Sequence, residues 1–187
     1  MSSHGGDAEA AVAALERGLV IGIPTDTVYG LAARNDRPAG IARIYELKGR
    51  PSDLELPVLV ADADQAGAMA DGGRLPEVAA RLAERHWPGA LTVVVAARGG
   101  GTVGLRVPAQ DLVRALCRQA GPLASTSANR HGDPPLTTAA DVRAVFGDGL
   151  AVVVDGGVCD RPPSTVVDCT GPEPRVLRPG AVTPVLG

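Results

Sequence analysis

Four short segments of this sequence combine hydroxyl, amide or cationic side chains with glycine or proline in a way that a hydrophobic core does not require. Such hydroxyls and amides can bind sugar, phosphate or carboxylate oxygens. Arginine can grip a phosphate in a forked geometry, and lysine supplies a point charge. The segments are 24–30 (PTDTVYG), 48–51 (KGRP), 125–129 (STSAN) and 163–168 (PSTVVD), the last with Arg178-Pro179-Gly180 downstream.

Each of these segments also has a purely structural interpretation. The threonines of 24–30 are compatible with a hydrogen-bonded turn, and the two cations of 48–51 with solvated surface charge. The hydroxyls of 125–129 are equally typical of a turn or a helix N-cap. Arg178 could be a structural ion-pair partner. Taken one at a time, the segments therefore leave the function open.

The elements that must position these segments alternate along the chain. Apolar runs bounded by Gly and Pro predict strands, and longer periodic stretches predict helices. An α/β domain follows from this interleaving. The apparent hairpin over 91–108 argues against a purely parallel sheet. We expect helices at 8–17, 38–47, 75–86, 109–119 and 138–146, and strands at 19–23, 57–61, 91–97, 104–108, 122–125, 151–155, 164–168 and 175–178.

Length and composition predict one soluble domain over 1–187, with residues 1–6 disordered. The chain has 187 residues, 45% of them hydrophobic, and a net charge of −3, which gives no argument for general nucleic-acid binding. Cys117, Cys159 and Cys169 are an odd number without CxxC spacing, so we expect buried thiols in a reducing compartment. No signal-peptide pattern or membrane span is found, and we expect a cytoplasmic protein.

Several common motifs are absent or out of context. Gly99, Gly101 and Gly104 fit GxGxxG, but the strand predicted at 104–108 follows them where a dinucleotide-binding turn needs a helix. There is no GxxxxGK[ST] motif for a phosphate-binding loop. The three histidines lack metal-ligand spacing, and we predict no protein-bound metal.

Read in order, the polar segments resemble the threonylcarbamoyl-AMP synthase (YrdC-like) family in its single-domain form. Any one of the motifs is weak evidence, but seven in the family's order are specific. They extend from about residue 18 to residue 180. The motifs are PTDTVYGL (24–31), KGRP (48–51), WPGALT (87–92), GLRVP (104–108), STSAN (125–129), PSTVVD (163–168) and RPG (178–180).

The resemblance implies a twisted mixed sheet with flanking helices and an open central cavity. It implies a nucleotidyltransferase that converts L-threonine, bicarbonate and ATP into threonylcarbamoyl-AMP and diphosphate. Similar enzymes do this for the threonylcarbamoyladenosine modification of tRNA, and a separate transferase complex uses the product. Mg²⁺ is expected with ATP, held by phosphates and water rather than by a dedicated cage.

The matching positions imply roles for individual residues, with Lys48 and Arg50 as the catalytic cations at the triphosphate. The expected ATP-binding residues are Lys48, Arg50, Thr102, Ser127, Asn129 and Arg178. The expected threonine-binding residues are Thr27, Arg106, Ser125 and Ser164.

The sequence differs from similar enzymes at positions that bear on amino-acid selectivity. Asp26 stands where many have Glu, Leu54 and Glu55 replace a polar-Pro pattern, and Leu59 occupies a position where some members have histidine. The stretch 51–55 is our candidate lid. Weak RNA binding is also compatible with the sequence. Two alternatives remain: a carbamoyl-adenylate-forming enzyme for another acceptor, or a nucleotide- or RNA-binding module that lacks synthase activity.

Overall fold

The computed structural model describes residues 4–49, 51 and 55–186 and has mixed α/β architecture. Its helices are α1 (His4–Glu16), α2 (Pro38–Lys48), α3 (Ala63–Met69), α4 (Glu77–His86), α5 (Asp111–Ala120) and α6 (Ala139–Phe146). Its strands are β1 (Ile21–Ile23), β2 (Gly30–Arg34), β3 (Val58–Leu59), β4 (Leu91–Ala96), β5 (Thr102–Arg106), β6 (Leu123–Ser127), β7 (Thr165–Asp168) and β8 (Arg175–Arg178). Among these helices, none is long and apolar enough to cross a membrane.

The strands form one eight-stranded sheet in the order β1-β2-β6-β3-β5-β4-β7-β8. Two neighbouring pairs, β3–β5 and β4–β7, are parallel, and the others are antiparallel. The expected mixed sheet is therefore confirmed, and so is the hairpin, which β4 and β5 form. The glycines of the GxGxxG pattern at 99 and 101 lie in its turn with φ of 96° and 73°.

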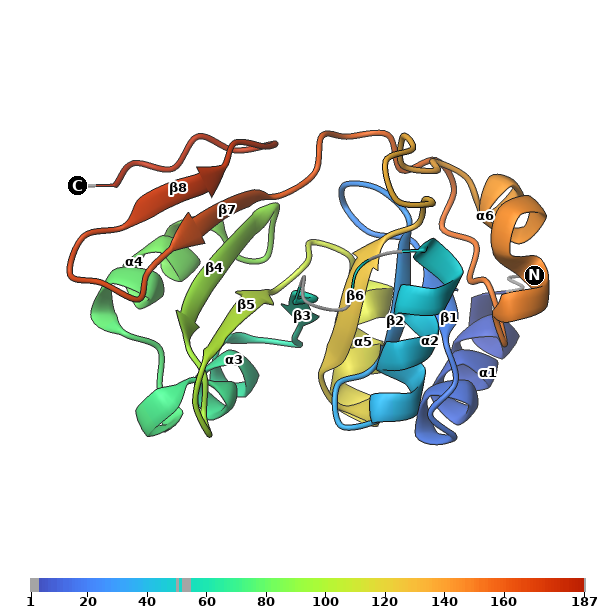
Figure 1. The fold of residues 1–187 in the computed structure, drawn as a ribbon, viewed down its shortest axis with the longest axis horizontal. Coiled ribbons are helices and arrows are strands. Elements are labelled where there is room, and N and C mark those ends of the chain that lie inside the picture. Colours follow the sequence, from blue (N-terminus) through green and yellow to red (C-terminus); the bar gives the residue numbers. More distant parts are fainter. Residues whose placement is uncertain (1–3, 50, 52–54, 187) are drawn as a thin grey trace.

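Two groups of elements lie side by side in Figure 1. The first contains β1, β2 and β6 with α1, α2, α5 and α6, and the second contains β4, β5, β7 and β8 with α3 and α4. The two-residue strand β3 joins them, because Val58 pairs with Leu105 of β5 on one side and with Ala124 of β6 on the other. The sheet thus continues from one half to the other through its shortest strand.

Alternation along β4 and β5 divides their side chains between the core and the opposite face. Val93, Val95 and Leu105 are buried in a hydrophobic cluster with residues of α3 and α4. Successive side chains of a strand point to opposite faces, so Thr92 and Arg106 project from the other face of the sheet. These two polar side chains are nevertheless buried. A strand with one apolar and one polar buried face predicts a cavity over the polar one.

Local sequence explains how α2 begins and ends. Pro38 occupies its first turn, where the missing N–H costs nothing. Gly49 ends it in the left-handed conformation with φ of 61°, and its N–H bonds to the carbonyl of Glu46. This end matters for function because Lys48 is the last residue of the helix.

Some expectations about local structure were wrong. Residues 4–6 are helical rather than disordered, and 1–3 lie outside the described residues. Residues 151–155 do not form a regular strand. They run alongside the short edge strand β1 and share one isolated bridge with it, between Val153 and Gly22. The strand expected at 104–108 runs from Thr102 to Arg106 instead, because its pairing with β4 already begins at Thr102.

Two elements were not expected from the sequence. β2 has the sequence GLAAR, and glycine and alanine are depleted in strands, so its composition carries no strand signal. α3 has only seven residues and lacks a clear period; its start is set by Asp62, whose carboxylate accepts a hydrogen bond from the backbone N–H of Gln65 at 2.9 Å.

The buried face of β5 gives a direct test of the core. Leu105 is fully buried, so Leu105→Ala should lower the free energy of unfolding by about 2–5 kcal/mol, because the lost methyl groups leave a cavity. Leu177 on β8 is 50% exposed, and Leu177→Ala should cost less than about 0.5 kcal/mol. Urea denaturation followed by circular dichroism measures both; similar losses would contradict this core.

Candidate active site

A cavity of about 350 Å³ lies between the two halves, over the polar face of the sheet. The turn between β1 and β2 and the end of β6 line it from one half. Strands β4 and β5, the segment entering β7, and Arg178 line it from the other. Its lining residues are Thr25, Thr27, Val28, Tyr29, Gly30, Glu55, Leu56, Pro57, Leu59, Thr92, Val94, Gly104, Arg106, Ser125, Thr126, Ser127, Pro163, Ser164, Val166 and Arg178.

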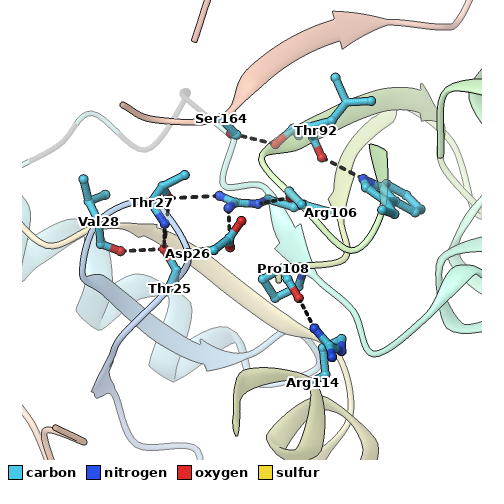
Figure 2. Close-up of polar contacts among 12 residues, drawn as sticks. Thr25, Asp26, Thr27, Val28, Thr92, Arg106, Pro108, Arg114 and Ser164 are labelled. Atoms are coloured by element: carbon cyan, nitrogen blue, oxygen red, sulfur yellow. Dashed lines mark hydrogen bonds and ion pairs between the residues drawn. The ribbon is translucent and has the colours of Figure 1, made fainter. Parts of the chain in front are cut away.

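Arg106 of β5 crosses from one half to the other at this cavity (Figure 2). Its Nη2 donates to Oδ1 of Asp26 at 2.6 Å and its Nη1 donates to Oγ1 of Thr27 at 3.2 Å. Its Nε donates to the carbonyl of Gly89 at 2.9 Å. Within the described part of the chain, these bonds use three of the five N–H donors of a guanidinium. The remaining donors are available to a ligand in the cavity.

The charge of Arg106 is held in a buried environment. Burial lowers the pKa of Arg106, and the nearby positive charge of Arg178 acts in the same direction, while the Asp26 carboxylate opposes both. A guanidinium nevertheless remains protonated in proteins. The ion-pair side chains are only 7% and 11% exposed, so a ligand anion there would interact with a cation that water screens weakly.

The turn that presents Asp26 is fixed by its own hydroxyls. Oγ1 of Thr25 donates to the carbonyl of Val28 at 2.6 Å and lies 2.9 Å from Oγ1 of Thr27. The backbone N–H of Thr27 donates back to Oγ1 of Thr25 at 3.1 Å. The turn interpretation and the site interpretation of 24–30 therefore both hold, since the turn bonds orient the residues that face the cavity.

Lys48 holds the loop after β6 through hydrogen bonds from its side chain. Its Nζ donates to the carbonyl of Ser127 at 2.6 Å, to the carbonyl of Asn129 at 2.8 Å and to Oδ1 of Asn129 at 3.0 Å. Oγ of Ser127 donates to the same Oδ1 at 2.6 Å. Lys48 is only 3% exposed, so its cation lies under the hydroxyl-rich loop and next to the cavity wall rather than in the cavity lining.

A third polar group lies at the opposite wall. Nη2 of Arg178 donates to the carbonyl of Ser164 at 2.8 Å and to its Oγ at 3.3 Å. Oγ of Ser164 lies 2.9 Å from Oγ1 of Thr92. Gly180 permits this arrangement, because a Cβ at that position would lie 2.3 Å from the carbonyl oxygen of Pro163 and 2.6 Å from the carbonyl carbon of Ser164.

The structure brings most of the predicted residues together. All four positions expected for threonine line the cavity, and so do Ser127 and Arg178. Lys48 and Asn129 join them through the Ser127 loop. Thr102 lies at the start of β5, where Oγ1 donates to Glu55 Oε2 at 3.5 Å. Arg50 and Leu54 lie outside the described residues, as does most of the candidate lid 51–55.

Sequence reasoning missed several cavity residues. Thr92 carries a polar side chain within the apolar strand LTVVVA, and that interruption was a usable signal. Tyr29 was also missed: its hydroxyl donates to the carbonyl of Gly157 at 2.9 Å and accepts from the N–H of Gly156 at 3.0 Å. It thereby ties the segment leading to Ser164 to the turn that carries Asp26.

The three cysteines are buried free thiols, as expected from their number and spacing. Burial raises the pKa of the Cys117 thiol to about 12 and that of Cys169 to about 11. Few of these thiols are ionised near neutral pH, and the thiolate is the nucleophilic form. In residues 4–49, 51 and 55–186, no group of three or more His, Cys, Asp and Glu side chains could hold a metal ion.

Comparison with known proteins identifies the family. The Sua5/YciO/YrdC family model, described as "Telomere recombination", matches residues 13–180. The chain belongs to the Sua5/YciO/YrdC family. The resemblance inferred from seven motifs is therefore confirmed over nearly the whole chain.

Individual members of the Sua5/YciO/YrdC family carry more specific names. The chain is 40% identical over 169 residues to the threonylcarbamoyl-AMP synthase of Chromohalobacter salexigens, covering 84% of this chain and 90% of that one. It is 40% identical over 185 residues to the Bacillus subtilis threonylcarbamoyl-AMP synthase, covering 92% of this chain and 53% of that one.

A solved family structure confirms the fold. Pyrococcus abyssi Sua5, complexed with L-threonine, superposes with a TM-score of 0.86 at 36% identity, covering 92% of this chain and 54% of that one. The chain thus spans about half the length of the Bacillus and Pyrococcus proteins. The open mixed sheet with flanking helices is the family's architecture.

The buried ion pair is the part of the site most sensitive to loss of one partner. Asp26→Asn leaves the Arg106 charge uncompensated and should cost about 3–5 kcal/mol of unfolding free energy. The surface pair Arg34–Asp36, with Asp36 59% exposed, provides the matched control. Asp36→Asn should cost less than about 1 kcal/mol. Equal losses in chemical denaturation would contradict a desolvated pair at the cavity.

Proposed function

We propose that this chain is an L-threonylcarbamoyladenylate synthase, which forms threonylcarbamoyl-AMP and diphosphate from L-threonine, bicarbonate and ATP. The observation that carries the proposal is the cavity in which a buried guanidinium, Arg106, is surrounded by hydroxyl groups from both halves of the sheet. The names of the family members at 40% identity support it.

The reaction requires a weak nucleophile and several anions in one place. The amine of threonine first attacks the carbon of bicarbonate; a C–N bond forms and water leaves, which gives an N-carboxylate. One carboxylate oxygen then attacks the α-phosphorus of ATP, a new P–O bond forms, and the bond to the bridging oxygen breaks to release diphosphate. Because attacking and leaving groups are both anionic, positioning and charge neutralisation supply most of the catalysis.

We assign the amino acid to the region around Arg106. The two unused N–H donors of its guanidinium suit the threonine carboxylate, and bidentate pairing of this kind is directional as well as strong. Thr27, Ser125 and Ser164 line the same region and are the proposed partners of the substrate's other polar groups. Leu59, also in the lining, offers an apolar surface to the threonine methyl group.

We assign ATP to the part of the cavity that lies between the loop after β6 on one wall and Arg178 on the other. Ser127, Asn129, Thr102 and Arg178 are the proposed contacts, with Arg50 from the segment after α2. Lys48 supports this side by holding the carbonyls of the loop, and its charge adds to the positive potential there. In the proposal Mg²⁺ arrives bound to the phosphates of ATP.

The wider context is also proposed. We infer a single functional domain over 1–187, since one continuous sheet includes both cavity walls. We infer a cytoplasmic location, where ATP and tRNA are found, and delivery of the product to a separate tRNA threonylcarbamoyl transferase complex. A carbamoyl adenylate for another acceptor, or a nucleotide- or RNA-binding module without turnover, are the alternatives that the assay below distinguishes.

Diphosphate release from ATP and bicarbonate should depend on L-threonine. Lys48→Ala should reduce this release by about a hundredfold or more, because three oxygens of the phosphate-side loop lose their shared donor. Ser127→Ala, which leaves the lysine in place, should also reduce it. A coupled diphosphate assay measures both, and thermal melting shows whether each variant is folded.

Arg81→Ala is the matched control, since it removes a cation that pairs with Glu77 on the exposed surface of α4. Its rate should equal that of the wild type. Release without threonine dependence would favour another acceptor. Nucleotide binding without any release would favour the binding-module alternative and contradict the synthase.

A further inference from the structure

Thr92 is a buried hydroxyl in the cavity that the roles proposed above leave unassigned. It projects from β4, is 3% exposed, and lies 2.9 Å from Oγ of Ser164, which is itself 7% exposed. Burying a hydroxyl in a strand costs free energy unless it is hydrogen-bonded. All other residues of β4, whose sequence is LTVVVA, are apolar.

Hydrogen-bond counting shows what this pair can still do. Two hydroxyls carry two protons, and their shared bond uses one of them. Arg178 can only donate, so its bond to Ser164 Oγ uses a lone pair and not a proton. In the part of the chain that the structure describes, one hydroxyl proton of the Thr92–Ser164 pair therefore has no protein acceptor. Both residues line the cavity, where a ligand oxygen could accept it.

The charge of Arg178 sets which hydroxyl donates in the hydrogen bond between Ser164 and Thr92. The guanidinium of Arg178 polarises the Ser164 hydroxyl that accepts its bond, which makes that hydroxyl a better donor. The cooperative arrangement runs from Arg178 to Ser164 and from Ser164 to Thr92. The remaining proton then belongs to Thr92, at the end of the chain.

We propose that Thr92 is a substrate-binding residue whose hydroxyl, oriented through Ser164 and Arg178, donates a hydrogen bond to a carboxylate oxygen of the amino-acid substrate. Ser164 then acts on that oxygen through Thr92. The acceptor is an anion because the cavity already presents the Arg106 guanidinium from the adjacent strand β5. This inference rests on the proposed function for the identity of the substrate and adds a contact to it.

Steric contacts support Thr92 rather than a larger side chain at this position. A Cβ on Gly104, which lines the cavity from the adjacent strand β5, would lie 3.3 Å from Cγ2 of Thr92. The methyl group of Thr92 is therefore packed against Gly104, which restricts rotation of the side chain. A valine has the same shape as threonine and can replace it without this packing being lost.

The test uses the full chain and steady-state kinetics of diphosphate release. Thr92→Val should raise KM for L-threonine about tenfold, the value expected for losing one hydrogen bond to a charged group. KM for ATP should stay within about twofold of the wild type, because the proposed hydrogen bond from Thr92 goes to the amino acid. Thr92→Ser, which keeps the hydroxyl, should restore KM for threonine to within about threefold of the wild type.

The double variant Thr92→Val/Ser164→Ala separates this relay from two independent contacts. Both residues act through one hydrogen bond to the substrate. The KM for threonine of the double variant should therefore equal that of the more impaired single variant, within about twofold. Multiplied effects would overturn the relay.

Thr165→Val controls for simple loss of a buried threonine hydroxyl. The Thr165 hydroxyl donates to the carbonyl of Val182, away from the cavity lining. Its loss should lower the melting temperature without the selective rise in KM for threonine.

The outcomes distinguish this inference from the proposed function. A wild-type protein without threonine-dependent release would overturn both. An active wild type together with an unchanged KM for threonine in Thr92→Val would overturn the Thr92 assignment alone. If Thr92→Val does not fold, a tenfold impairment in the folded Thr92→Ser variant would also contradict it.

Discussion

The buried guanidinium of Arg106 is the group on which the arrangement of the cavity depends. It reaches from β5 of one half to Asp26 and Thr27 of the other, and its third bond holds the carbonyl of Gly89 before β4. Desolvating a cation is costly, and a single carboxylate with two further acceptors compensates it only if their positions are fixed. The hydroxyl-bonded turn at 25–28 and the short strand β3 provide that fixed geometry between the halves.

The polar groups of the site are organised in two layers. Those in the cavity lining, such as Arg106 and Thr92, present unused donors to a ligand. Behind the lining, Lys48 holds the loop after β6, which carries Ser127 of the first layer. This division explains why substitutions outside the lining can affect activity: they change the positions of donors whose catalytic value depends on preorganisation.

Much of this arrangement could be predicted from the sequence, and the failures have physical reasons. The seven motifs identified the family, and the apolar runs in LTVVVA and GLRVP predicted two of the strands. Residues 151–155 were misassigned because their apolar character reflects burial beside β1 rather than regular pairing. The role of Lys48 could not be read from KGRP, since its bonds to Ser127 and Asn129 join residues about 80 positions apart along the chain. Thr92 interrupts the apolar sequence LTVVVA, but its pairing with Ser164, which lies just before β7 and 72 positions along the chain, could not be read from the sequence.

The activity that we propose joins threonine, bicarbonate and the adenylyl group in one product at this cavity. Mass spectrometry of a reaction with ATP, L-threonine and bicarbonate containing heavy carbon tests it most directly. We expect threonylcarbamoyl-AMP with the heavy carbon in its carbamoyl group, formed in step with diphosphate. Diphosphate accompanied by AMP alone, or by an adenylate without the label, would contradict it.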